Sequence, residues 1–221
     1  MNQKNFSRQP TNNDKKIQIK QFDNRREQIL DIAAKVFREQ GYHRSTLSEI
    51  AQEVGILKGS LYYYIKSKED LLYQIVLPMV TSYVDSLDKI LISNEKADVV
   101  LKKAIIAHME PMDLNLDRQS VFITETKFLS EKRLREINKQ IGKYEGLWLD
   151  VIKKGIKNNI FKDNIDPKML LFLILGAANW TIRWYRPGGK YTIGQISEMY
   201  AENILNGLIK NQESPRKSLH K

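Results

Sequence analysis

Lys58, Ser60 and three consecutive tyrosines lie close together, in the run Lys-Gly-Ser-Leu-Tyr-Tyr-Tyr from 58 to 64. Ammonium and hydroxyl groups donate hydrogen bonds to phosphate oxygens and to base edges, so this run could bind a nucleic acid. Lys58 is the candidate for a guanine contact, with a phosphate contact as the alternative. Gly59 would let the backbone approach a groove. Core packing is the alternative for the tyrosines, and we expect it in part for Tyr64.

The composition favours an anionic partner and excludes several kinds of site. Lysine and arginine number 36 against 26 aspartates and glutamates, which gives a formal net charge of +10. Because the chain has no cysteine, it offers no disulfide, thiolate ligand or cysteine nucleophile. The histidines are too scattered for a metal-ligand set, at His43, His108 and His220. Since a phosphate-binding glycine loop and a catalytic triad are also missing, we expect no enzyme, no metal and no cofactor.

The polar run belongs to a group of three predicted helices. The first has an N-cap at Asp23 and an apolar stripe from Ile29 to Phe37, and Gly41 ends it. The second opens with a capping box made of Thr46 and Glu49. The polar run itself forms the third.

A tight turn at Gly55 separates the second helix from the third. Two helices joined in this way, the later one with an exposed polar face, are typical of a helix-turn-helix. We therefore predict a DNA-binding domain over residues 23–72 with its motif at 46–65. Ser67 and Asp70 form another capping box, which opens a long helix.

Both ends of the chain are predicted to be unstructured. Residues 1–22 are polar and basic, which favours a flexible arm, and residues 212–221 favour a disordered tail. The N-terminus lacks the apolar run of a signal peptide. The most apolar stretch, 169–178, is shorter than the roughly 20 residues that cross a bilayer. We therefore expect a cytoplasmic protein without a membrane partner.

The remaining residues, 73–211, are predicted to form a second helical domain. Their apolar residues keep helical spacing, strand patterns are absent, and proline or glycine marks the breaks. The predicted fold class is all-α, with a C-terminal domain for effector binding and dimerisation. The predicted helices are Asp98–Met109, Asp117–Phe128, Glu131–Asn159, Pro167–Tyr185 and Ile193–Lys210.

Dimerisation is expected because a single helix-turn-helix reads too few base pairs for specificity. The last two helices are apolar enough to form a homodimer interface, although a monomeric core would explain the same pattern. The helix that begins at Glu131 places Trp148 and other apolar residues on one side. Gly142 and Gly146 leave room beside them, which fits a pocket wall, with close helix packing as the alternative.

The stretch from Thr46 to Leu72 resembles the N-terminal signature of the TetR family of transcriptional regulators, and the match extends over about residues 24–75. It includes Gly-Ile-Leu-Lys-Gly-Ser-Leu-Tyr-Tyr-Tyr, in which Leu57 replaces the Ser or other small polar residue common in the family. This departure predicts a weaker helix cap or an altered phosphate contact, without loss of the motif. By the resemblance, the positions that contact phosphates are Thr46, Tyr62 and Lys68. Those that face bases or the groove wall are Lys58, Gly59, Ser60 and Tyr63.

The stretch from Gly176 to Gly189, which contains Asn-Trp, Trp-Tyr and Pro-Gly, resembles TetR members that respond to coenzyme A thioesters in fatty-acid and sterol-ring degradation. Such regulators hold an acyl chain in an apolar tunnel and the anionic nucleotide near the surface. Arginines would bind the phosphates and tryptophans would stack on a planar ring. Alternatively, the tryptophans anchor the dimer and the arginines cap a helix. The expected effector residues are Trp148, Asn179, Trp180, Arg183, Trp184 and Arg186.

Together these features lead us to expect a repressor that binds double-stranded operator DNA and that an acyl-CoA thioester releases. A dimeric DNA-binding protein without an effector is the second hypothesis. A third is a repressor that senses a lipophilic cation through aromatic rings and buried carboxylates such as Glu110 or Glu125.

Overall fold

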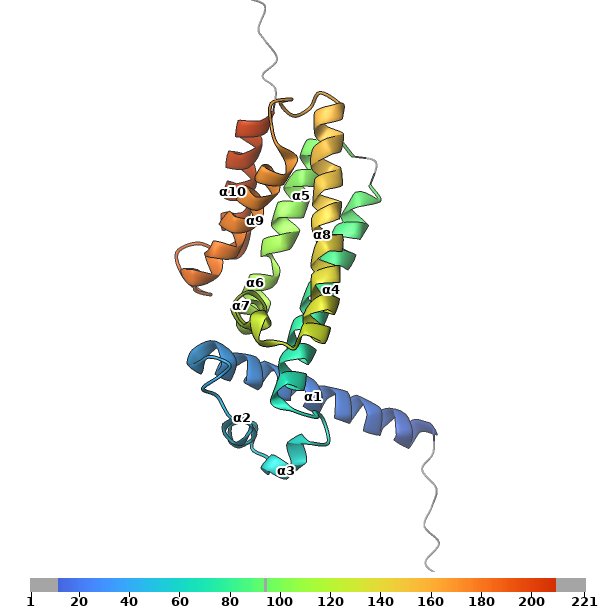
Figure 1. Cartoon of the computed structure of the whole chain (residues 1–221), viewed down its shortest axis with the longest axis vertical. Coiled ribbons are helices and arrows are strands. Elements are labelled where there is room, and N and C mark those ends of the chain that lie inside the picture. Colours follow the sequence, from blue (N-terminus) through green and yellow to red (C-terminus); the bar gives the residue numbers. More distant parts are fainter. Residues whose placement is uncertain (1–11, 94, 210–221) are drawn as a thin grey trace, which may run out of the picture.

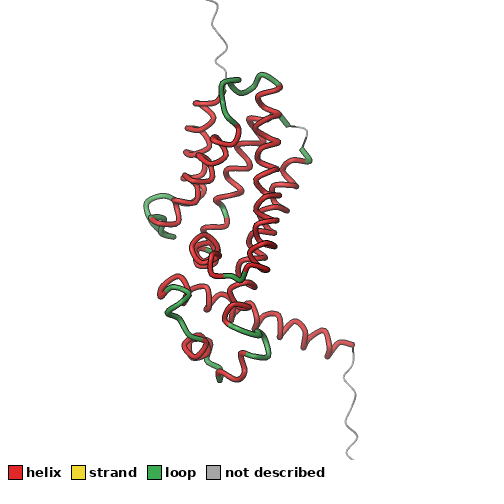
Figure 2. Tube along the Cα trace, viewed as in Figure 1, coloured by secondary structure: helices red, strands yellow, loops and turns green. Residues whose placement is uncertain are grey.

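The computed structural model describes residues 12–93 and 95–209, with side chains from residue 20 onward. Figures 1 and 2 show that the chain is built from helices and the loops between them. Within the described ranges, β-type pairing is limited to an isolated bridge between Phe161 and Ile209. The all-α prediction is confirmed.

The first helix is longer than predicted. α1 extends from Asn12 to Gln40, so the prediction of a flexible arm is wrong from Asn12 onward. Glycine and proline are absent from residues 12–40, and lysine and glutamine are good helix formers. The ring of Phe22 also stacks on that of Tyr64, with 4.8 Å between centroids, which attaches this segment to the domain. Residues 1–11 and the tail predicted at 212–221 lie outside the described residues.

Two short helices complete the predicted helix-turn-helix, α2 (Leu47–Val54) and α3 (Lys58–Leu61). The Thr46 hydroxyl accepts the N–H of Glu49, and the Glu49 carboxylate accepts that of Thr46, so the predicted capping box is confirmed. Gly55 ends α2 at φ 74°, a conformation that a side chain would strain. Leu57 precedes α3 without any side-chain cap, as its departure from the family pattern predicts.

α4 (Lys68–Leu91) joins this domain to the rest of the chain. The Ser67 hydroxyl accepts the N–H of Asp70, as a capping box requires. The Asp70 carboxylate, however, accepts the N–H of Lys66 and forms an ion pair with Arg133 at 2.7 Å. The predicted capping box is therefore only half formed, because a tertiary partner takes the carboxylate.

In the C-terminal part, the helices Ala97–Met109, Leu116–Glu125 and Glu131–Lys157 pack beside α4, and the helices Pro167–Trp180 and Ile193–Leu208 pack on these rather than on α4 (Figure 1). A 3₁₀ turn replaces the last residues of the predicted 117–128 helix, and another ends the predicted 167–185 helix after Trp180. The elements are α5 (Ala97–Met109), α6 (Pro111–Leu114), α7 (Leu116–Glu125), η1 (Thr126–Phe128), α8 (Glu131–Lys157), α9 (Pro167–Trp180), η2 (Thr181–Arg183) and α10 (Ile193–Leu208).

Two apolar cores meet along α4, α7 and α8. The N-terminal core, around Phe37 and Leu61, continues past the predicted boundary at residue 72 to Val80, Val121 and Ile137. The C-terminal core surrounds Trp148. The two domains are therefore continuous through shared helices rather than joined by a linker.

Ion pairs add to this connection on the outside of α7. Arg118 binds the carboxylates of Glu27 and Asp31 on α1, at 2.8 and 2.7 Å. Arg38 of α1 binds Asp117 at 2.6 Å. α7 is thus attached to the first helix of the DNA-binding domain.

Candidate functional site

The polar surface of α3 lies at the end of the molecule farthest from α9 and α10 (Figure 1). Tyr63 is 81% exposed and Tyr62 52% exposed, and Lys58 is also exposed. Leu57, at the start of the helix, is 80% exposed. Tyr64 is half-buried against Phe22, in agreement with its expected part in packing. The predicted base-facing residues thus form one accessible surface, with Ser60 half-buried at its edge.

Lys68 and Thr46 flank this surface but already have partners. The Lys68 ammonium donates to the backbone carbonyls of Ser45 and His43 and lies 4.5 Å from the ring centroid of Tyr42. Burial lowers the pKa of Lys68 from its usual value. The Thr46 hydroxyl is engaged in the α2 cap. Both residues therefore hold the loop before α2 in place, and any phosphate contact would be made in addition to that role.

An internal cavity of about 300 Å³ lies among α4, α5, α7, α8 and α9. One part of its wall is apolar: Val80, Phe122, Ile123, Ile141 and Leu175. The other part is polar: Tyr83, His108, Thr126, Tyr144, Glu145 and Asn179. A cavity that combines an apolar wall with polar groups is typical of a small-molecule site, and this volume is at the lower end of the usual range.

His108 is the centre of the polar part. Its Nδ1 lies 3.0 Å from the Tyr144 hydroxyl and its Nε2 lies 3.2 Å from Oδ1 of Asn179. Burial lowers the pKa of His108 to about 4, so the imidazole is neutral near pH 7. Trp148 packs edge-on against both His108 and Tyr144.

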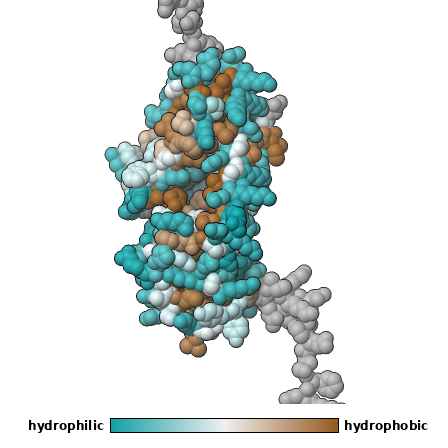
Figure 3. Space-filling model, in the orientation of Figure 1, coloured by the Kyte–Doolittle hydropathy of each residue, from teal (hydrophilic) through white to brown (hydrophobic). Residues whose placement is uncertain are grey.

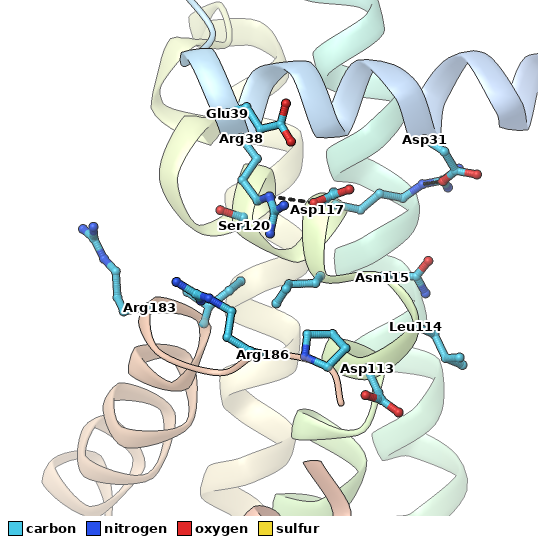
Figure 4. Close-up of a pocket in the computed structure, with 14 residues that line it drawn as sticks. Asp31, Arg38, Glu39, Asp113, Leu114, Asn115, Asp117, Ser120, Arg183 and Arg186 are labelled. Atoms are coloured by element: carbon cyan, nitrogen blue, oxygen red, sulfur yellow. Dashed lines mark hydrogen bonds and ion pairs between the residues drawn. The ribbon is translucent and has the colours of Figure 1, made fainter. Parts of the chain in front are cut away.

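A second pocket, of about 810 Å³, opens between α1, α7 and the end of α9, and Figure 4 shows its lining. Asp31 and Asp117 are paired with arginines of α7 and α1, and Asp113 accepts the hydroxyl of Tyr185. Arg183 and Arg186 also line it, on the side opposite α1 (Figure 4). Among the described residues, neither of these two arginines forms an ion pair. Arg186 donates one hydrogen bond to the Tyr185 carbonyl and Arg183 lies 5.8 Å from the ring centroid of Trp180, so both keep N–H donors for an anion.

The outer face of α9 is unusually apolar. Met169, Phe172, Leu173 and Trp180 recur at helical spacing, and Trp180 is 64% exposed. Figure 3 shows such apolar patches on the C-terminal part of the molecule, between hydrophilic ones. An exposed stripe of this kind is typical of a protein interface.

Comparison with known proteins identifies the family to which both parts of the chain are similar. Residues 29–75 match bacterial regulatory proteins of the TetR family, and residues 95–208 match the tetracyclin repressor-like C-terminal domain. The chain belongs to the TetR family. It is therefore a DNA-binding transcriptional regulator and not an enzyme, and the first resemblance noted in the sequence is confirmed.

Regulators named for lipid metabolism are among the relatives of this TetR protein. The HTH-type transcriptional repressor KstR2 of Rhodococcus jostii is 29% identical over 185 residues, which cover 83% of this chain and 91% of that protein. The fatty acid metabolism regulator protein of Bacillus subtilis is 27% identical, with coverages of 82% and 94%. The structure of ketosteroid transcriptional regulator KstR2 of Mycobacterium tuberculosis has a TM-score of 0.81 at 28% identity, and the match covers 84% of this chain and 95% of that one.

The effector residues expected from sequence fall into three separate places in this TetR fold. Asn179 lines the internal cavity and Trp148 packs behind it. Arg183 and Arg186 line the outer pocket. Trp180 and Trp184 are exposed and line neither of these two spaces.

Sequence reasoning missed the importance of His108, which it names only among histidines too scattered to bind a metal. Only the packing of α5 against α8 and α9 shows that it is the polar centre of the cavity. The carboxylates expected for a cation site lie elsewhere: Glu110 is exposed, and Glu125 accepts the N–H of Tyr42. In the described part of the chain, three or more potential metal ligands do not gather anywhere, and no helix is long and apolar enough to span a membrane.

Proposed function

We propose that this protein is a dimeric repressor that leaves its operator when an acyl-CoA thioester binds its C-terminal domain. The acyl group enters the internal cavity, and Arg183 and Arg186 bind the phosphates of the nucleotide. The observation that carries the proposal is that a cavity with an apolar wall and two arginines, which form no ion pair with the described residues, lie on either side of the same elements. Both spaces are bounded by α7 and by the segment that ends α9.

The arginines suit a phosphate because their guanidinium groups donate several hydrogen bonds in one plane. Four acids line the same pocket. Asp31, Asp113 and Asp117 already have hydrogen-bonded partners, and Glu39 lies on α1, on the side opposite the two arginines (Figure 4). An apolar acyl group is favoured in the cavity because burial removes its hydrocarbon surface from water. The names of the steroid and fatty-acid regulators among the relatives agree with a lipid-derived effector.

α7 is the element that would transmit binding to DNA. Phe122 and Ile123 of α7 line the internal cavity, while Arg118 and Asp117 hold α1. A ligand that displaces α7 would therefore move α1, and with it α2 and the recognition helix α3, which packs on α2. In a dimer, this changes the separation of the two recognition helices from the roughly 34–36 Å of one DNA turn, and operator affinity falls.

The DNA-binding part is tested with an operator selected from random duplexes. We expect Lys58→Ala to weaken binding at least tenfold and to lower the slope of log affinity against log salt by about 1 if Lys58 contacts a phosphate. Lys89→Ala is the matched control, because it removes the same charge from an exposed position on the C-terminal part of α4. Equal operator affinity for wild type and Lys58→Ala would show that Lys58 does not contact the DNA.

The effector part is tested by thermal unfolding with an acyl-CoA, the corresponding free acid and free coenzyme A. A thioester at a hundredfold excess over its Kd should stabilise the protein by about 2.7 kcal/mol, or roughly 5–10 °C. The same thioester should release the operator. Absence of any shift with the thioesters would contradict the acyl-CoA assignment and leave DNA binding intact.

The arginine pair is tested in the same assay. The double variant Arg183→Gln/Arg186→Gln should bind the thioester at least tenfold more weakly and the free acid unchanged. Arg135→Gln is the control, since Arg135 lies on the exposed face of α8 and makes only a surface ion pair with Glu131. Equal losses for the thioester and the free acid would show a structural defect rather than a phosphate site.

A further inference from the structure

The polar end of the internal cavity has hydrogen-bonding capacity that an alkyl chain would not use. Oδ1 of Asn179 is an acceptor, so Nε2 of His108 carries the proton that they share, and Nδ1 accepts the hydroxyl proton of Tyr144. The Asn179 amide nitrogen is left without a hydrogen-bond partner among the described residues. Asn179 itself lines the cavity, so this donor is placed to meet a ligand.

A second polar pair borders the same space. The hydroxyl of Tyr83, which lines the cavity, is hydrogen-bonded to the side-chain amide of Gln119. Oε1 of Gln119 is buried without a partner, on a residue that is only 1% exposed. Buried polar atoms without partners are rare in folded proteins, because each costs free energy. Gln119 does not line the cavity itself, so its unpaired oxygen marks an incompletely satisfied group next to Tyr83, while the Asn179 nitrogen is a partly exposed donor in the cavity wall.

These polar side chains are uncharged near pH 7. Burial lowers the pKa of His108 to about 4 and raises the pKa values of Tyr83 and Tyr144 above their usual range. A ligand carboxylate would lose its hydration here without gaining a cation, and Glu145 on the same wall would repel it. The chemistry that fits is a neutral oxygen, which accepts a hydrogen bond and carries no charge.

We propose that the buried end of the cavity binds a keto or hydroxyl oxygen on the apolar part of the effector, with Asn179 as donor and Tyr83 and Tyr144 beside it. This inference rests on the proposed function and narrows the ligand class from acyl groups in general to oxygenated ones. A plain alkyl chain would fill the same volume but would leave these polar groups dry and unpaired, so the cavity discriminates against it.

The experiment compares two thioesters of equal chain length, one of them carrying a keto oxygen near the far end of the chain. Wild type should bind the keto thioester about tenfold more tightly, a difference of about 1.4 kcal/mol. Asn179→Leu and Tyr83→Phe should each reduce this preference to about twofold or less, because the Tyr83 hydroxyl accepts from Gln119 and keeps its own proton for a ligand, whereas that of Tyr144 is donated to His108. Tyr73→Phe is the matched control, because its hydroxyl bonds to Glu136 outside the cavity, and it should keep the wild-type preference.

The same pair is also measured as free acids, so that the two proposals fail separately. Suppose that the protein binds the keto acid more tightly than the plain acid but binds neither thioester. This result would support an oxygen-binding site in the cavity and contradict the acyl-CoA assignment. Equal affinity of wild type for the two thioesters would overturn the present inference and leave the proposed function standing. An undiminished keto preference in both variants, with unfolding temperatures that show intact folding, would also overturn it.

Discussion

His108 shows how one residue takes its properties from its surroundings. In sequence it is a histidine on an amphipathic helix, with an ordinary pKa of about 6.5. In the fold it packs against the rings of Tyr83 and Tyr144, which also contact each other, and is 5% exposed. Burial removes water from the imidazole and so disfavours its protonated form, which is why its pKa falls although the hydrogen bond with Asn179 acts in the opposite direction.

The stability of the protein should therefore depend on pH through His108. As pH falls below 6.5, the unfolded chain binds a proton at this residue, whereas the folded state does not until about pH 4. The free energy of unfolding should fall across this window by up to roughly 3 kcal/mol more than in His108→Gln. Urea unfolding at pH 7 and pH 4.5 measures the difference, and equal losses in the two proteins would contradict a buried neutral histidine.

Leu57 offers a second residue-scale prediction. Its exposed side chain precedes α3 and provides no oxygen for the free N–H groups of that helix. Leu57→Ser should raise the free energy of unfolding by about 1 kcal/mol, because it supplies the missing cap. Leu57→Ala, which removes the side chain without adding an acceptor, is the control. A serine variant no more stable than the alanine variant would show that the helix end is satisfied by water.

At the scale of elements, the glycines of α8 differ in what surrounds them. Close helix packing is one of the two roles expected from sequence for Gly142 and Gly146. A Cβ at Gly142 or Gly146 would meet nothing within 4 Å, so these residues make no close helix contact. A Cβ at Gly155 would lie 2.2 Å from the ring of Phe161, which is fully buried. The close contact in α8 is therefore at its end, where the chain folds back over the helix.

This contrast predicts opposite effects of the same substitution. Gly142→Ala should stabilise the protein by up to about 1 kcal/mol through helix propensity alone. Gly155→Ala should destabilise it by about 1–3 kcal/mol, because the Phe161 ring must move out of a packed core. Chemical denaturation of both variants measures the two changes, and a stabilising Gly155→Ala would mean that the ring relocates freely.

At the scale of the whole molecule, the apolar outer face of α9 is exposed to water and would be stabilised by contact with another protein surface. Leu173 is 62% exposed and lies in the stripe of Met169, Phe172 and Trp180. A second copy of the chain, packed through the last two helices, would cover this stripe and place two recognition surfaces on one side of a DNA duplex. In that arrangement the exposed Trp180 serves the dimer rather than the effector.

The dimer is tested by adding a charge to this face. Leu173→Glu should convert the protein to a monomer in sedimentation experiments and reduce operator affinity at least tenfold. Ile92→Glu is the control, since Ile92 is 84% exposed at the end of α4, away from the stripe. A Leu173→Glu protein that remains dimeric would place the interface on other elements.

The sequence alone determined what depends on local interactions. Helix periodicity, the capping box of Thr46 and Glu49 and the turn at Gly55 involve residues within a few positions of each other, so the helix-turn-helix and the all-α fold could be predicted. The start of α1 at Asn12 was not predicted. The polar composition of this segment suggested a flexible arm, but its helix propensity and the tertiary contact of Phe22 with Tyr64 make it helical.

Only the tertiary structure decided which residues share a site when they are far apart in sequence, and which neighbours in sequence lie in different sites. Six predicted effector residues on α8 and around the end of α9 are split among a cavity, a pocket and an exposed face, since helical packing sends neighbours in sequence in different directions. The cavity's polar cluster joins residues from five helices, among them His108, Tyr144 and Asn179, and sequence spacing carries no signal for it. Burial then sets the charge state of these groups, which residue identity leaves open.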